Sequence, residues 1–358
     1  MMIIFTRWLA ILLVAFAMTA CGSSSSSSPS TTSSAIIGMT LSADGNTLYV
    51  ANADKHVIQA VNLATAAVST YAGGEGLVGA TAGTGTAARF YEPFSVVRLG
   101  SSLYVADTFN QGIRKIDSSQ VVTTLAGKLG YVGAIDDTGI AAIFNYPKGI
   151  TTDGTDFYVA DTANYLIRKV TAAGAVTGLA GSSGQSGYVD GAAGSGTKFG
   201  TPFAVAATST HVYVSDSSNH SIRSVRISDG TVATLAGSTS GTSGSTDSPA
   251  GPGTTARFNT PAGIATDGTN VYVADSGNHT IRKIVIATGV VSTIAGTAGS
   301  ADSTDAATGP GTTAKFNNPI GLALDAAGTT LYVSDQNYTK VRKIALGTGV
   351  VTTLSSTF

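Results

Sequence analysis

The sequence predicts an all-β protein whose main domain, residues 36–358, is a six-bladed β-propeller of four-stranded antiparallel blades. A thirteen-residue string, "YVADSGNHTIRKI" in its fifth copy, recurs six times, and its copies begin 54 to 60 residues apart at Tyr49, Tyr104, Tyr158, Tyr213, Tyr272 and Tyr332. A period of this size indicates a repeat architecture. Each period contains four short β segments, and no segment shows a sustained helical period.

The fifth copy shows the four predicted strands most clearly. Residues 262–266 (strand a), 271–275 (strand b), 280–286 (strand c) and 290–296 (strand d) are rich in β-branched and aromatic residues, with Gly, Asn and Asp between them. Their nearly continuous apolar runs predict burial of both faces against neighbouring blades. Closing the ring would then leave only short blade edges exposed.

The repeat resembles the NHL repeat. The residues that carry the resemblance in the fifth copy are "PAGIATDGTNVYVADSGNHTIRKI", residues 261–284, and the same pattern returns in register along residues 36–358. The resemblance implies a six-bladed propeller.

An Asp at the end of strand b and an Arg in strand c recur seven residues apart. In the first copy both are replaced, by Asn52 and Gln59. A cross-hairpin ion pair explains this joint loss, because either charge alone in a partly buried site would be costly. The sequence therefore predicts structural ion pairs: Asp107–Arg114, Asp161–Arg168, Asp216–Arg223, Asp275–Arg282 and Asp335–Arg342.

An Asn follows three residues after the Asp in most copies. Because Asn tolerates a positive φ, Asn110, Asn164, Asn219 and Asn278 are expected to occupy left-handed turn positions.

Strand direction predicts which face carries function. The b–c turns and the connections from strand d to the next strand a lie on one face, here called the top face, and the connections are long: 73–90, 127–144, 181–199, 237–258 and 296–316. A Phe ends each connection and is expected to anchor it. The residue at the tip of each b–c turn varies, which suits either recognition or a solvated surface. The candidate binding residues are His56, Gln111, Tyr165, His220, His279 and Thr339.

The sequence offers little for an enzyme. Some six-bladed propellers are lactonases or lyases with a metal in the central channel, but no HxH, HExxH or paired-carboxylate spacing appears. Arg98 is a candidate channel residue that could meet an anionic ligand. No cofactor is expected, apart from weak calcium binding in the top-face loops by aspartates that lack a recognised calcium-loop spacing: Asp136, Asp137, Asp190, Asp247, Asp302 and Asp305.

The first 35 residues predict export and anchoring. Residues 1–20 have the apolar run of a signal peptide, and Met18-Thr19-Ala20-Cys21 resembles the lipobox of bacterial lipoproteins. The resemblance implies cleavage before Cys21, lipidation of Cys21, and a location in the bacterial cell envelope, at the outer membrane if the cell is Gram-negative. Residues 21–35 are a Ser/Thr-rich tether.

These features predict an envelope-anchored, non-catalytic binding or scaffold module that acts through its top face. The expected partner is an envelope or extracellular protein or glycan. A net charge of −1 gives no electrostatic case for nucleic acid as a partner. We expect contact with the membrane through the lipid anchor only, and we expect a monomer. The alternatives are a channel-metal enzyme of lactonase or lyase type, and a structural surface protein.

Overall fold

The computed structural model describes residues 35–192, 196–335, 339–355 and 358. The predicted signal peptide (1–20), Cys21 and the tether up to residue 34 lie outside the described residues.

Six sheets of antiparallel strands follow one another along the chain, each in the order a, b, c, d. The first three blades are β1 (Ile36–Leu41), β2 (Thr47–Asn52), β3 (Val57–Asn62) and β4 (Val68–Ala72); β6 (Pro93–Leu99), β7 (Ser102–Asp107), β8 (Gly112–Ile116) and β9 (Val121–Ala126); and β10 (Pro147–Thr152), β11 (Phe157–Asp161), β12 (Leu166–Val170) and β13 (Val176–Gly181).

The other three blades repeat the pattern. They are β14 (Pro202–Ala207), β15 (His211–Asp216), β16 (Ser221–Arg226) and β17 (Val232–Gly237); β18 (Pro261–Thr266), β19 (Asn270–Asp275), β20 (Thr280–Val285) and β21 (Val291–Ala295); and β22 (Pro319–Leu324), β23 (Thr330–Asp335), β24 (Lys340–Ala345) and β25 (Val350–Ser355). The four strands predicted in the fifth copy match β18–β21 to within one residue at each end.

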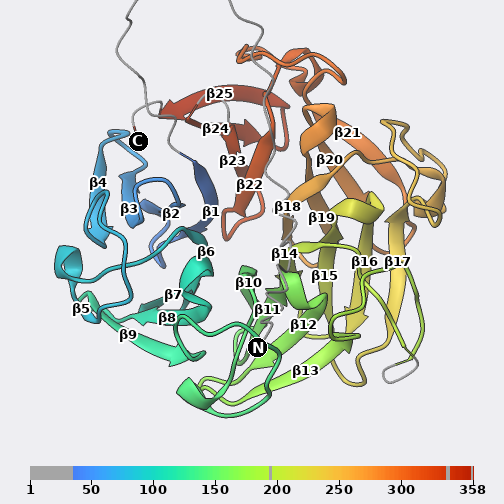
Figure 1. Ribbon diagram of the computed structural model, residues 1–358. Helices are drawn as coiled ribbons and strands as arrows, with labels where there is room; N and C mark the ends of the chain where they lie inside the picture. The colour runs from blue at the N-terminus through green and yellow to red at the C-terminus, as the bar shows by residue number, and fades with distance from the viewer. Residues whose placement is uncertain (1–34, 193–195, 336–338, 356–357) are drawn as a thin grey trace, which may run out of the picture. The chain divides into compact units, whose positions relative to one another are not determined.

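The blades form a closed ring, which confirms the six-bladed propeller (Figure 1). The inner strands β1, β6, β10, β14, β18 and β22 each contact the inner strands of both neighbouring blades, and β1 contacts β22 at the seam. The approach there is close: a Cβ on Gly321 would lie 1.6 Å from the carbonyl oxygen of Ile37, so only Gly fits. Among the described residues, the first and sixth blades exchange no strand, although Ser334 Oγ donates a hydrogen bond to Ile37 O across the seam.

The hydrophobic core lies between adjacent blades. Ile222 and Ala236 of the fourth blade pack with Val271 and Val273 of the fifth, and Phe258 from the intervening connection completes the cluster. Strand b is buried along most of its length in each blade, as β7 shows. This burial explains why its sequence reads as an apolar run rather than as an alternating pattern.

The long connections were predicted to lie on the top face. In the structure they also run along the outer edge of the following blade. In the first connection β5 (Gly83–Thr84) pairs with β9, giving that sheet a fifth strand. Single bridges join the other connections to the outer region of the next blade: Thr138↔Ala175, Gly191↔Val232, Ser248↔Val291 and Ala306↔Val351. The connections therefore cover blade edges that would otherwise expose unpaired backbone groups.

The helical segments of the described residues are three-residue 3-10 turns, such as η2 (Thr108–Asn110) in a b–c turn and η3 (Gly139–Ala141) in a connection. Within this described part of the chain, no helix could act as a transmembrane span.

Candidate functional site

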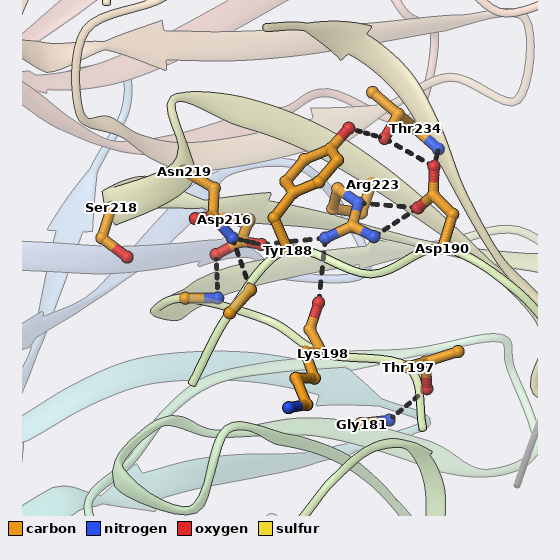
Figure 2. Close-up of polar contacts among 12 residues, drawn as sticks. Gly181, Tyr188, Asp190, Thr197, Lys198, Asp216, Ser218, Asn219, Arg223 and Thr234 are labelled. Carbon is orange, nitrogen blue, oxygen red and sulfur yellow. Dashed lines mark hydrogen bonds and ion pairs between the residues drawn. The ribbon is translucent and has the colours of Figure 1, made fainter. Parts of the chain in front are cut away.

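The arginine of the repeated string is buried, and in the fourth blade it lies among side chains of the blade and of the preceding connection (Figure 2). Arg223 on β16 is fully buried, and its Nη1 lies 3.1 Å from Oδ2 of Asp216 at the end of β15. Its Nη2 contacts Asp190 of the connection 181–199, and its Nη1 also donates to Lys198 O. The Phe199 ring lies 5.3 Å from the guanidinium carbon. The arginine thus joins a hairpin to the connection that precedes its own blade.

The same arrangement recurs in the second to sixth blades. The structure brings together all five predicted pairs, with N–O distances of 2.8–3.2 Å and essentially no exposure of either side chain: Asp107–Arg114, Asp161–Arg168, Asp216–Arg223, Asp275–Arg282 and Asp335–Arg342. Each guanidinium also faces the Phe that ends the connection, at 4.8–5.6 Å, and these rings are fully buried: Phe90, Phe144, Phe199, Phe258 and Phe316. Burying such a ring stabilises the fold by roughly 1.5–3 kcal/mol.

Burial and hydrogen bonding act in opposite directions on the Asp. Burial raises the pKa of Asp107 and of Asp275 to about 6, while the facing arginine and N–H donors of the connection and turn pull it down. The guanidinium and the N–H groups all donate to the carboxylate, and this geometry suits the ionised form of the Asp.

Four loop aspartates provide a second carboxylate, which the sequence did not reveal. Opposite each arginine, strand d contains one extra residue, and the irregular pairing leaves an amide to be satisfied. Asp247 meets both needs in the fifth blade: its Oδ1 lies 2.6 Å from Arg282 Nη2, and its Oδ2 accepts the amide of Thr293 at 3.0 Å. The aspartates in this role are Asp136, Asp190, Asp247 and Asp305.

These contacts bear on the expectation of weak calcium binding. Four of the six candidate aspartates already bind an arginine and an amide, which leaves Asp137 and Asp302. Asp302 lies near Lys315. No group of three or more His, Cys, Asp or Glu side chains suited to a metal occurs among the described residues.

The first blade differs from the other five at this position. Asn52 Nδ2 donates to Gln59 Oε1 at 2.8 Å, in place of the ion pair. The first blade therefore holds a neutral hydrogen-bonded pair at the position where the other five blades hold a buried ion pair.

The prediction for the turn Asn residues was wrong. Asn110 lies in η2, and the left-handed residue is the next one, Gln111, at φ 61°. The Asn amide instead donates to Asp107 Oδ2 and to Gly79 O of the connection, at 2.8 and 2.6 Å. The turn residue is thus another fastening between hairpin and connection. Asn164, Asn219 and Asn278 make the equivalent contacts.

The six turn-tip residues all lie in the left-handed region, with φ between 50° and 61°: His56, Gln111, Tyr165, His220, His279 and Thr339. Four of them bind the next blade. His220 Nδ1, for example, accepts the amide of Thr260 at 3.0 Å, and Gln111 Oε1 accepts the amide of Tyr146 at 2.6 Å. His56 and His279 accept the amides of Glu92 and Asn318, both at 3.2 Å. The variable tips therefore include side chains that connect neighbouring blades.

Arg98 lies on β6 and binds backbone carbonyls. Its Nε donates to Leu41 O of the first blade at 3.0 Å, and its Nη1 donates to Gly100 O at 2.9 Å. The inner strands enclose an axial cavity of about 210 Å³ whose described lining is apolar or carries hydroxyl groups, and neither Arg98 nor any other charged residue is part of it. Among the described residues that line the cavity there is no Asp, Glu, His or Cys.

Sequence reasoning missed an exposed apolar patch on the top face, formed by Leu77, Val78, Tyr91, Phe109, Tyr131 and Val132. The Tyr91 and Phe109 rings lie 5.0 Å apart. Asn110 joins the two connections of the patch, since its side chain binds Gly79 O and its carbonyl accepts the amide of Gly130. The signal in the sequence was the departure of these residues from the Gly, Ser and Thr of the later connections.

Comparison with known proteins agrees with this architecture. Residues 258–284 match the NHL repeat. Human NHL repeat-containing protein 2 is 27% identical over 299 residues, which cover 74% of this chain and 40% of that protein. The chain spans less than half the length of the curated relatives it matches.

Two solved structures share the fold at low identity. An auxiliary nutrient binding protein from Bacteroides thetaiotaomicron VPI-5482 aligns with a TM-score of 0.64 and 15% identity, over 90% of this chain and 69% of that one. Virginiamycin B lyase from Staphylococcus aureus aligns with a TM-score of 0.53 and 12% identity, over 89% and 83%.

The fold and the fastened connections define the chain as a six-bladed β-propeller. More particularly, it is a propeller that carries an NHL repeat in its fifth blade.

The ion pair of the second blade is expected to show strong coupling. Asp107→Asn leaves Arg114 buried without a carboxylate and should cost about 3–5 kcal/mol of unfolding free energy. The double variant Asp107→Asn/Arg114→Gln introduces the neutral pair of the first blade and should cost less than the sum of the two single variants. Chemical denaturation of the four proteins measures this difference, and additive losses would refute a coupled pair.

The turn-tip histidines should make stability sensitive to acid. Burial lowers the pKa of His56, His220 and His279, while Asp54 opposes the shift at His56 and Asp216 opposes it at His220. A lowered folded-state pKa means that the histidine contribution is fully present above the unfolded value of about 6.5 and is lost as pH falls through the folded value.

The test is a triple His→Gln variant at 56, 220 and 279, because Gln111 already binds the next blade in this way. Its melting temperature should fall less between pH 7 and pH 5 than that of the unmodified protein. An equal fall in both proteins would show that the histidines do not sense acid.

Proposed function

We propose that the protein is a non-catalytic binding module that holds a protein partner on the apolar patch of its top face. The observation that carries the proposal is the exposure of large apolar side chains in the first two connections and in the b–c turn between them. Tyr131 is 56% exposed and Val132 is 62% exposed. Clustered exposed apolar residues mark interaction sites more often than scattered ones do.

The repeat itself shows that the patch is not required by the fold. At the positions of Leu77–Val78 and Tyr131–Val132, the next three connections carry Gln185–Ser186, Thr242–Ser243 and Ser300–Ala301. At the position of Phe109, the fourth and fifth blades carry Ser218 and Gly277. The same backbone is therefore built without the apolar side chains in the second half of the ring.

The mixture of side chains favours a protein as the partner. The patch combines aliphatic Leu77, Val78 and Val132 with the rings of Tyr91 and Phe109, and such a combination suits the apolar centre of a protein interface. The similarity of the fold to an auxiliary nutrient binding protein agrees with a binding role. The lyase-like alternative, suggested by another neighbour, finds no support in the uncharged wall described for the axial cavity.

We also propose that Cys21 carries a lipid that anchors the chain in a bacterial cell envelope, at the outer membrane if the cell is Gram-negative. The support is the lipobox-like Met18–Cys21 after an apolar run, followed by the Ser/Thr-rich tether. A tether of this kind would act as a flexible link between the anchor and the propeller.

The apolar patch can be removed by residues from another copy of the repeat. Phe109→Ser, Tyr131→Gln and Val132→Ser introduce the side chains of the fourth-blade connection and turn, so the fold should be retained. In crosslinking capture from envelope extracts with the full chain, the swap should lower recovery of a specific protein at least tenfold. The matched control, Gln185→Ala/Ser186→Ala/Ser218→Ala, should leave recovery unchanged. Equal capture by both variants, or capture of a polysaccharide instead, would refute the proposed partner.

Lipidation can be tested separately. In a bacterium grown with labelled palmitate, the full chain should take up the label and fractionate with membranes, and Cys21→Ser should abolish both. Label in the Cys21→Ser variant, or none in the unmodified chain, would contradict the proposed anchor.

A further inference from the structure

One lysine interrupts an otherwise apolar ring at the top end of the axial cavity. The register of strands a and b places one residue from each blade at the same position, the second residue of strand a. The six residues are Ile37, Phe94, Lys148, Phe203, Ala262 and Ile320. Five are apolar, and four of these, Ile37, Phe94, Phe203 and Ile320, line the cavity. Lys148 directly precedes Gly149, which also lines it.

Two aromatic rings hold the Lys148 ammonium beside the cavity. Its Nζ lies 5.1 Å from the centroid of the Phe94 ring and 4.9 Å from that of the Phe203 ring. The two rings meet edge to face, with centroids 5.0 Å apart, although they belong to the second and fourth blades. The cation is therefore in an aromatic setting at a rim shared by three blades.

Lys148 is half-buried, and it lacks the carboxylate partner that each buried arginine of the repeat has. Each buried arginine of the repeat contacts an aspartate. No carboxylate oxygen of the described residues lies within 4.0 Å of Lys148 Nζ, and burial lowers the pKa of this ammonium. Ring faces replace only part of the lost hydration, so an apolar residue, as in the other five blades, would serve the fold better.

We propose that the axial cavity binds a small amphipathic carboxylate, whose acid group pairs with Lys148 and whose apolar body lies against Phe94, Phe203 and the cavity wall. The ammonium supplies the charge for the acid group. Below it the wall is apolar with a few hydroxyl groups, among them Ser95 and Thr151. Since an apolar cavity of about 150 Å³ suffices for benzene, a cavity of about 210 Å³ has room for a benzoate-sized ligand.

Calorimetric titration of the full chain with benzoate, and with benzyl alcohol as the neutral probe of similar size, tests the proposal. Benzoate should bind, and Lys148→Met should weaken its binding at least about tenfold, because a charge-assisted hydrogen bond is lost. Benzyl alcohol should bind both proteins equally. Lys148→Met introduces an apolar side chain like those at the other five positions, so the propeller should remain folded, which its melting temperature will show.

Two controls locate the binding. Lys115→Met removes a lysine of strand c (β8) that does not line the cavity and should leave benzoate binding unchanged. The patch swap Phe109→Ser/Tyr131→Gln/Val132→Ser should also leave it unchanged, so this result is independent of the proposed protein partner. Failure of benzoate to bind the unmodified chain at millimolar concentration, or equal binding by Lys148→Met, would overturn the proposal.

Discussion

The structure depends on how five buried arginines are compensated. Taking a guanidinium out of water is costly unless its charge is paired and its N–H groups have acceptors. The second to sixth blades pair the charge with an aspartate from the b strand and supply carbonyl acceptors from the preceding connection, and four of them add a loop aspartate. Among the described residues, Nε of Arg114, Arg168 and Arg342 has no acceptor. Each arginine therefore fastens a hairpin, a connection and the edge of a blade at one point. The Phe beneath it and the Asn beside it complete the same junction.

The residues that hold the connections serve the structure and not recognition. The Asp, Arg, Asn and Phe of the repeat have internal partners, so the residues available for recognition are those that depart from the repeat. Two such departures lie at the top of the ring. The apolar patch replaces small polar residues in two connections, and Lys148 replaces an apolar residue at the axial rim. The proposed functions rest on these departures, which are confined to neighbouring blades.

The sequence was sufficient for the fold but only partly for the sites. Period and strand patterning predicted the six blades because each copy repeats the same burial. The joint loss of charge at Asn52 and Gln59 pointed to the Asp–Arg contact. The role of Asp136, Asp190, Asp247 and Asp305 could not be read, because it depends on where an irregular connection returns to the next blade. The hydrogen bonds of the turn-tip histidines and of the turn Asn side chains also depend on contacts with segments distant in sequence. The positive φ was therefore predicted at the Asn, although it belongs to the residue that follows it. The setting of Lys148 could not be predicted, because the two rings that its ammonium faces belong to the blades on either side.

Hydrogen exchange in an Asp247→Ala variant tests the central claim most directly. Asp247 joins Arg282 to the connection 237–258 and accepts the amide of Thr293. The account predicts at least tenfold faster exchange of the Thr293 amide and of the amides in this connection, such as Arg257, which donates to Thr246 O. Exchange in the connection 181–199, held by Asp190, should stay as it is in the unmodified protein. Unchanged exchange in both connections would show that the buried arginines do not fasten them.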